Sequence, residues 1–210
     1  MRTESIKQRK RWKVGIMGLI ALLGVFTMVS CDDDDDPVKE DVPELITKAT
    51  LTFTPAGGGT PVTSSATDPD GEGVQDIEVD GPINLTAGTT YTLTVSLINE
   101  LADPTDEEYN ITEEVEEEGD EHMFFYAWTN DVFSDPSGNG NIDNRADDVN
   151  YEDEDDNGQP LGLTTSWTAG SASTGTFRVV LKHQPDLKTD TSDANTGESD
   201  LDVIFTINVN

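Results

Sequence analysis

The chain contains very few cysteines, histidines and basic residues. Its 210 residues include one cysteine, two histidines and 12 lysines and arginines. A single cysteine excludes a disulfide framework and a zinc site built from cysteines. The 43 acidic residues outweigh the bases and give a net charge of −31. This balance excludes nonspecific binding to nucleic acid, because such binding depends on lysine and arginine neutralising phosphates.

The motifs of common catalytic classes are also missing. The sequence has no G-x-S-x-G nucleophile elbow, no P-loop and no G-x-G-x-x-G turn on a strand–helix unit. Acidic side chains are so numerous that no pair stands out as the two carboxylates of a glycoside hydrolase. Trp128 and Trp167 could stack on a sugar, but core packing is the commoner use of buried aromatics. We therefore expect a protein that is not an enzyme, with a glycan-active enzyme as a less favoured alternative.

The first 30 residues have the composition of a secretory signal. Six basic residues lie in 1–13, and the uncharged apolar segment 14–29 follows. That segment is shorter than the ~20 residues of a typical membrane span and contains three glycines. Ser30 and Cys31 at its end resemble the lipobox of bacterial lipoproteins, in which the cysteine receives the acyl chains. We predict a signal peptide over 1–30 and lipidation of Cys31; the alternative is an uncleaved signal anchor with an incidental cysteine.

The segment that follows the cysteine is strongly acidic. Residues 32–36 are five aspartates, and 37–44 contains two prolines, so 31–44 is predicted to be a linker. Removal of 1–30 would leave a net charge of about −36, since that segment holds six bases and one acid. Aspartates directly after a lipidated cysteine also resemble the surface-export signal of Bacteroidota lipoproteins. We expect a protein anchored to the outer membrane by lipid, facing the surface or the periplasm.

Residues 45–210 show the pattern of an all-β domain. Apolar and polar residues alternate along several short segments, most clearly in 91–97 and 203–209. Turn residues separate these segments, and only the stretch around Ile111 and Val115 could form a turn or two of helix. Tyr91, which follows a turn, resembles the tyrosine corner of immunoglobulin-like sandwiches. The pattern predicts a single antiparallel β-sandwich, immunoglobulin-like in the broad sense, with about seven to nine strands.

Three acidic turns have the spacing of calcium loops. Residues 153–158 match the opening D-x-D-x-N-G, 135–140 match a looser version, and 68–73 form a third candidate. The first two lack the glutamate of an EF-hand at the twelfth position. Asp, Asn and Gly also form turns without any ion, so both interpretations stay open. The candidate calcium ligands are Asp153, Asp155, Asn157, Asp135, Asn139, Asp68 and Asp70.

The two histidines, His122 and His183, lie at the ends of predicted strands. If these strands are neighbours, two imidazoles and a carboxylate would suit zinc, copper or iron. Glu121 and Asp120 are the candidate carboxylates, because they directly precede His122. The alternative is that His122 is a solvated edge residue and His183 covers one end of the core.

Several stretches resemble one family of small lipoproteins. Residues 113–126, 157–163 and 181–185, with 51–55, are similar to Bacteroidota lipoproteins carried under the name "type 1 periplasmic binding fold superfamily protein". The resemblance spans most of 45–210, and both histidines fall within it. Members of that family accompany TonB-dependent receptors, so the resemblance implies such a receptor as a partner.

The sequence therefore predicts a lipid-anchored binding protein of the outer membrane or cell surface. Its cargo would be a cation or a metal complex, captured for the receptor. Calcium or a transition metal would be the bound ion. The alternative is a structural or adhesive surface lipoprotein with calcium-stabilised loops.

Overall fold

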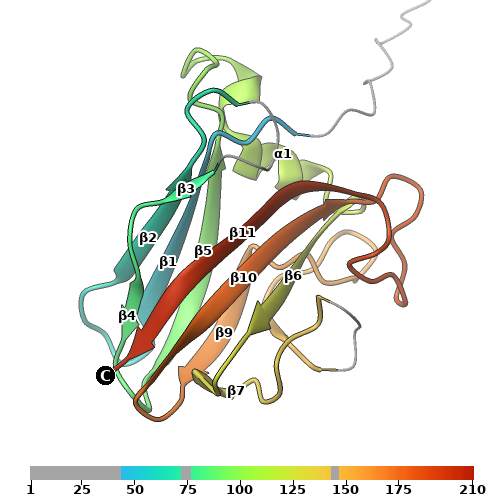
Figure 1. Ribbon diagram of the computed structural model, residues 1–210. Coiled ribbons are helices and arrows are strands. Elements are labelled where there is room, and N and C mark those ends of the chain that lie inside the picture. The colour runs from blue at the N-terminus through green and yellow to red at the C-terminus, as the bar shows by residue number, and fades with distance from the viewer. Residues whose placement is uncertain (1–43, 72–76, 143–146) are drawn as a thin grey trace, which may run out of the picture. The chain divides into compact units, whose positions relative to one another are not determined.

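The structure is a computed structural model that describes residues 44–71, 77–142 and 147–210. The predicted signal peptide, the predicted lipidation site and the linker up to residue 43 lie outside the described residues. Within the described ranges, none of the helices has the length and apolar character needed to cross a membrane. Two β-sheets pack face to face (Figure 1), which confirms the predicted all-β sandwich.

The larger sheet has seven strands among the described residues, in the order β3-β2-β1-β5-β9-β7, with β8 beside β9. All of its strand pairs are antiparallel. Its strands are β1 (Lys48–Pro55), β2 (Val62–Thr67), β3 (Glu78–Val79), β5 (Thr90–Ile98), β7 (Phe133–Asp135), β8 (Asn150–Tyr151) and β9 (Thr164–Ala169).

The smaller sheet has four strands in the order β4-β11-β10-β6. They are β4 (Ile83–Leu85), β6 (His122–Trp128), β10 (Ser173–His183) and β11 (Glu198–Val209). Strands β4 and β11 run parallel, and the other pairs are antiparallel. The described strands outnumber the seven to nine predicted, partly because β7 and β8 are only three and two residues long and lack the alternating pattern of the predicted strands.

The core consists of the apolar positions of the alternating segments, which face one another across the two sheets. In β5, Leu93, Val95 and Leu97 are buried, as the period-two pattern predicts. Trp128 and Trp167 pack edge to face with ring centroids 5.2 Å apart, and both are almost fully buried. They are therefore core residues and do not form a surface on which a sugar could stack.

Tyr91 forms the predicted corner. Its hydroxyl oxygen accepts a hydrogen bond of 3.0 Å from the backbone N–H of Thr86. Because Thr86 follows β4 and Tyr91 lies in β5, this bond ties down the connection between the two sheets. The predicted tyrosine corner is thus present.

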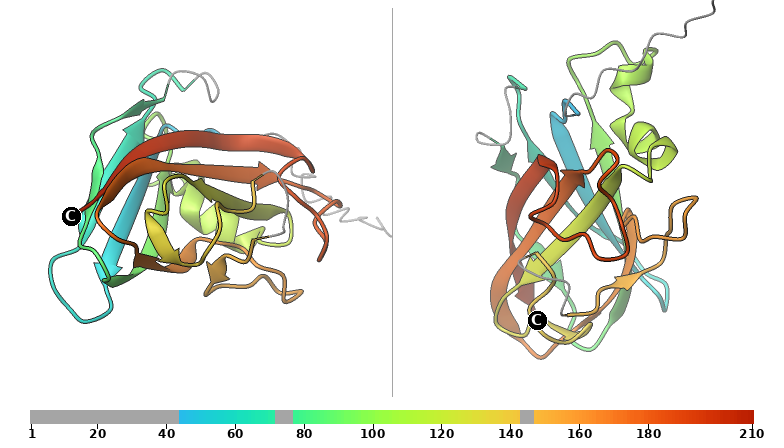
Figure 2. Two further views of the ribbon diagram at one scale, coloured as in Figure 1. Left: turned by 60° about the horizontal axis from the view of Figure 1, so that its bottom comes forward. Right: turned by 90° about the vertical axis from the view of Figure 1, so that its right-hand side faces the viewer.

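One short helix closes an end of the sandwich. After the 3₁₀ turn η1 (Glu107–Tyr109), helix α1 (Ile111–Glu117) buries Ile111 and Val115, where the sequence predicts helical turns. Because the acidic residues of α1 repel one another, the helix depends on the packing of these two side chains for its stability. Figures 1 and 2 show α1 at the end of the sandwich where β6 begins and β10 ends. Both histidines lie at that end.

Candidate metal centre

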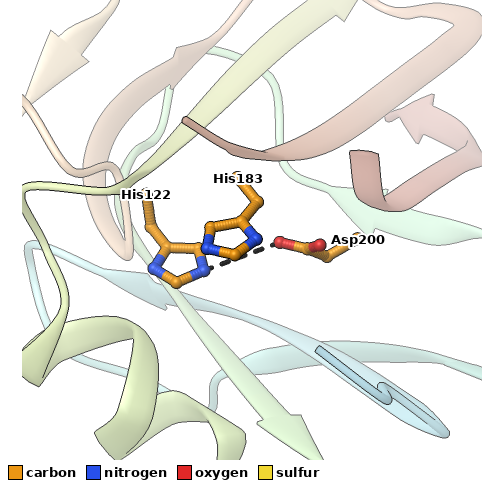
Figure 3. A group of neighbouring side chains, drawn as sticks. All are labelled: His122, His183 and Asp200. Atoms are coloured by element: carbon orange, nitrogen blue, oxygen red, sulfur yellow. Dashed lines mark ion pairs between the residues drawn. The ribbon is translucent and has the colours of Figure 1, made fainter. Parts of the chain in front are cut away.

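The two histidines come together because their strands are neighbours. His122 is the first residue of β6 and His183 the last of β10, and the antiparallel register places them directly opposite each other. Their rings stack with centroids 4.7 Å apart and an interplanar angle of 5° (Figure 3). The strand pairing on which the predicted metal site depends is therefore present.

Asp200 supplies the carboxylate beside this pair. Between β10 and β11 the register shifts: Leu181 pairs with Leu201, but Lys182 pairs with Ser199. Asp200 is the extra residue of this β-bulge. Strict alternation would turn its side chain away from Leu201 and the core, whereas both residues are buried here. The bulge thus re-aims a carboxylate toward the histidines, a common role of bulges near functional sites.

The hydrogen bonds of His122 define what faces Asp200. His122 Nδ1 lies 3.1 Å from the carbonyl oxygen of Glu118. A carbonyl oxygen only accepts, so Nδ1 carries a proton and the neutral ring keeps its lone pair on Nε2. That Nε2 lies 3.6 Å from Asp200 Oδ2 (Figure 3). When His122 is neutral, its Nε2 and Asp200 Oδ2 therefore face each other, and each of these two atoms can accept a proton or bind a cation.

The 3.6 Å separation matches two ligands of one metal ion better than a hydrogen bond. Zinc binds nitrogen and oxygen at about 2.0–2.1 Å, so two ligand atoms lie about 3.4 Å apart at the tetrahedral angle and about 4.1 Å apart when opposed. Hydrogen bonds to histidine nitrogen are shorter than about 3.2 Å. One donor atom from each of His122, His183 and Asp200 falls within 4.8 Å of the others. Small side-chain movements would place all three around one ion.

The centre is buried, and its carboxylate is destabilised by that burial. The side chains of His122 and Asp200 have no exposed surface, and that of His183 is 6% exposed. The backbone N–H of Glu44 donates a hydrogen bond to the Asp200 carboxylate, which lowers the pKa of Asp200 less than burial raises it. Burial raises the pKa of Asp200 to about 7, against the opposing effect of His183. A bound cation would compensate the buried negative charge.

Of the two carboxylates predicted from sequence, one lies at the edge of the centre. Glu121 Oε2 is 3.6 Å from His183 Nε2, and its side chain is 38% exposed. Asp120 is exposed, and neither Asp120 nor Glu121 belongs to the two groups with metal-binding geometry among the described residues. The second of these groups joins His122 to Glu44 and Glu118, which are partly buried. Three glutamates thus border the buried triad.

A buried ion pair holds the α1–β6 turn, which carries Glu118 and Glu121. Lys188 Nζ lies 2.8 Å from Asp155 Oδ2 and donates a 2.6 Å hydrogen bond to the carbonyl oxygen of Gly119. Both charged side chains are 1% exposed. Burial pushes the pKa of Asp155 up, but hydrogen bonds from Lys188 and Gln159 outweigh it, so the pKa lies below its ordinary value. The loops around 155 and 188 are thereby fixed to the α1–β6 turn.

The acidic turns use their oxygens within the chain. Asp153 accepts hydrogen bonds from the N–H groups of Gly162 and Thr164, one on each oxygen. Oδ1 of Asp155, the oxygen that does not face Lys188, accepts hydrogen bonds from the N–H groups of Asn157 and Gln159.

In the other two turns, some of the candidate oxygens also accept hydrogen bonds. Asp68 accepts from the N–H groups of Asp70 and Gly71, and Asp135 accepts from the side chain of Asn150. The main chain of Asn139 donates to Asp147. Neither metal-binding group in the described ranges includes a residue of these turns. Calcium ligation there stays a prediction, and the hydrogen bonds favour the turn-forming role.

Comparison with known proteins gives no relative from which a function could be transferred. No protein-family model, curated protein or solved structure matches this chain. The function has to be inferred from the chemistry of the centre itself.

Proposed function

We propose that this protein is a lipid-anchored protein of the outer membrane that binds one divalent transition-metal ion between His122, His183 and Asp200. The observation that carries the proposal is the buried approach of His122 Nε2 to Asp200 Oδ2, at a distance that suits two ligands of one ion. Two imidazoles and one carboxylate form a donor set found in zinc and non-haem iron proteins.

Nitrogen donors separate this proposal from the calcium-scaffold alternative. Calcium takes six to eight oxygen ligands, whereas imidazole favours zinc, copper, iron and nickel. The acidic turns, which the calcium alternative needs, already direct carboxylate oxygens at backbone N–H groups. We therefore favour a transition metal over calcium.

The membrane location and the partner rest on the sequence. The lipobox-like Cys31, the aspartates after it and the family resemblance support an anchored protein that delivers its ion to a TonB-dependent receptor. Mass spectrometry of the protein isolated from its own cells should find acyl chains on Cys31 as the first residue. An intact Met1 or a bare thiol would overturn the location and the inferred partner.

The metal site itself is tested by thermal unfolding of the full chain with Zn²⁺, Co²⁺ or Ca²⁺. At 100 times the dissociation constant, a bound ion adds about 2.7 kcal/mol to the free energy of unfolding. For a domain of this size that raises Tm by about 5–10 °C. We expect this rise with Zn²⁺ and Co²⁺, and its loss in His183→Gln and Asp200→Asn.

The exposed Asp120→Asn variant is the matched control, because it removes one charge beside His122 without removing a ligand. It should keep the full rise in Tm. A wild-type protein that no transition metal stabilises, or that only Ca²⁺ stabilises, would refute the proposed function.

A further inference from the structure

The centre is too enclosed to accept a metal that is still held by an organic ligand. His122 and Asp200 have no exposed side-chain surface, whereas sites that bind drug-sized molecules are hollows of about 300–1,000 Å³. One hollow of about 580 Å³ does occur on the surface, but it is lined by residues such as Ser96, Tyr109 and Glu113, and it contains no histidine. A chelated metal would fit there without reaching the histidines.

Glu121 connects this enclosed centre with solvent. Its side chain is 38% exposed, yet its Oε2 lies 3.6 Å from His183 Nε2. Its backbone is fixed on both sides, because its N–H donates to Glu118 and its carbonyl oxygen accepts from the N–H of Gln184. The carboxylate is therefore held at the edge of the site, with one side open to water and the other against a ligand.

We propose that the cargo is a free hydrated divalent ion, and that Glu121 receives it from solvent and passes it to His183. This inference rests on the proposed function and names its substrate class and access residue. Glu121 replaces part of the hydration shell before the ion reaches the buried ligands, which lowers the barrier to dehydration. The negative net charge of the protein attracts such ions over longer distances.

A residue on the uptake route changes rates more than affinity. In stopped-flow mixing of the full chain with Co²⁺, Glu121→Gln should lower the association rate constant on the order of tenfold. The dissociation rate constant should fall by a similar factor, because the ion leaves by the same route, so Kd changes little. Asp120→Asn removes one charge at the neighbouring exposed position, and screening should limit its effect to less than about twofold.

The outcomes separate this inference from the proposed function. If Glu121→Gln and Asp120→Asn change the association rate equally, Glu121 is not an access residue. If Glu121→Gln raises the dissociation rate alone, Glu121 is a resident ligand, and the inference is equally overturned. In both cases Co²⁺ still binds the wild-type protein, whereas no binding at all refutes the proposed function instead.

A separate experiment tests whether the protein takes up a free ion or a chelated one. Zn²⁺ offered as a complex with a slowly dissociating chelator should be taken up no faster than the chelator releases it. If the uptake rate instead rises with protein concentration, the protein takes the metal directly from the chelator through a complex of all three. Chelated metal would then be accepted. That result would overturn the assignment of a free ion.

Discussion

Replacing Lys188 by methionine should destabilise the protein more than the loss of any surface ion pair. Lys188 Nζ makes two contacts, at 2.8 Å to Asp155 and at 2.6 Å to the carbonyl oxygen of Gly119, and neither charged side chain is more than 1% exposed. Without the ammonium group, a buried carboxylate loses its only cationic contact among the described residues. Breaking such a pair typically costs about 3–5 kcal/mol.

Urea unfolding of wild type and Lys188→Met measures this cost directly. The expected loss is a large part of the roughly 5–15 kcal/mol by which domains are stable, and corresponds to a fall in Tm of about 10 °C. Lys48→Met is the matched control, because Lys48 pairs with Glu100 at 3.3 Å on the surface. Because the side chains of both partners are about one-third exposed or more, the control should lose less than about 1 kcal/mol of the free energy of unfolding.

A double variant distinguishes a buried charge from lost packing. Asp155→Asn removes the charge that Lys188→Met leaves behind, so the two changes together should recover about 1–2 kcal/mol relative to Lys188→Met alone. The argument fails if Lys188→Met is no worse than Lys48→Met, or if the double variant is less stable than Lys188→Met.

The same pair predicts a pH dependence. Because the folded-state pKa of Asp155 lies below its ordinary value, the pair's stabilisation is complete above the unfolded pKa of about 3.9. It is lost as the pH falls through the lower folded-state pKa. The Lys188→Met variant should therefore lose less stability than wild type when urea unfolding is repeated below about pH 4.

Two further substitutions test the corner and the frame of the metal centre. Tyr91→Phe should lower the free energy of unfolding by about 1–2 kcal/mol in urea, because it leaves a backbone N–H without its acceptor; an equal loss in Tyr109→Phe, a tyrosine outside the corner, would contradict this. Gly197 and Gly158 both have positive φ, but only at Gly197 would a Cβ meet the carbonyl oxygen of His183. Gly197→Ala should therefore weaken Co²⁺ binding as well as stability, whereas Gly158→Ala should cost only about 1 kcal/mol of stability. Equal Co²⁺ affinity in both variants would show that this contact does not position His183.

The strands of the fold and the buried direction of His183 follow from periodicity, which the sequence displays directly. His183 is in phase with Phe177, Val179 and Leu181, so a strand there turns all four side chains to the same buried face. The remaining condition, that β6 lies beside β10, is a long-range pairing that periodicity does not determine. The structure supplies it.

Asp200, the third residue of the proposed metal site, could not be found in this way, since its position depends on a break in the periodicity. In β11, Leu201, Val203 and Phe205 are buried on one face, and alternation assigns Asp200 to the other. Only the bulge reverses that assignment, and residues 198–200 show no pattern that separates a bulge from an unbroken strand. For the acidic turns, the sequence shows the spacing of calcium ligands. It does not show whether the carboxylate oxygens already accept hydrogen bonds from the backbone, as those of Asp153 do.

The distribution of unfavourable features supports the proposed metal site at the histidine end of the small sheet. At the other end of β6 and β10, Trp128 and Phe177 pair and fill the core with aromatic rings. The same strands end in two buried imidazoles, and the neighbouring strand is bulged to bury a carboxylate with a raised pKa. Apolar side chains would fill that end at lower cost. A cation bound between these groups would remove most of the cost, so the arrangement supports the proposed metal site over a purely packing role.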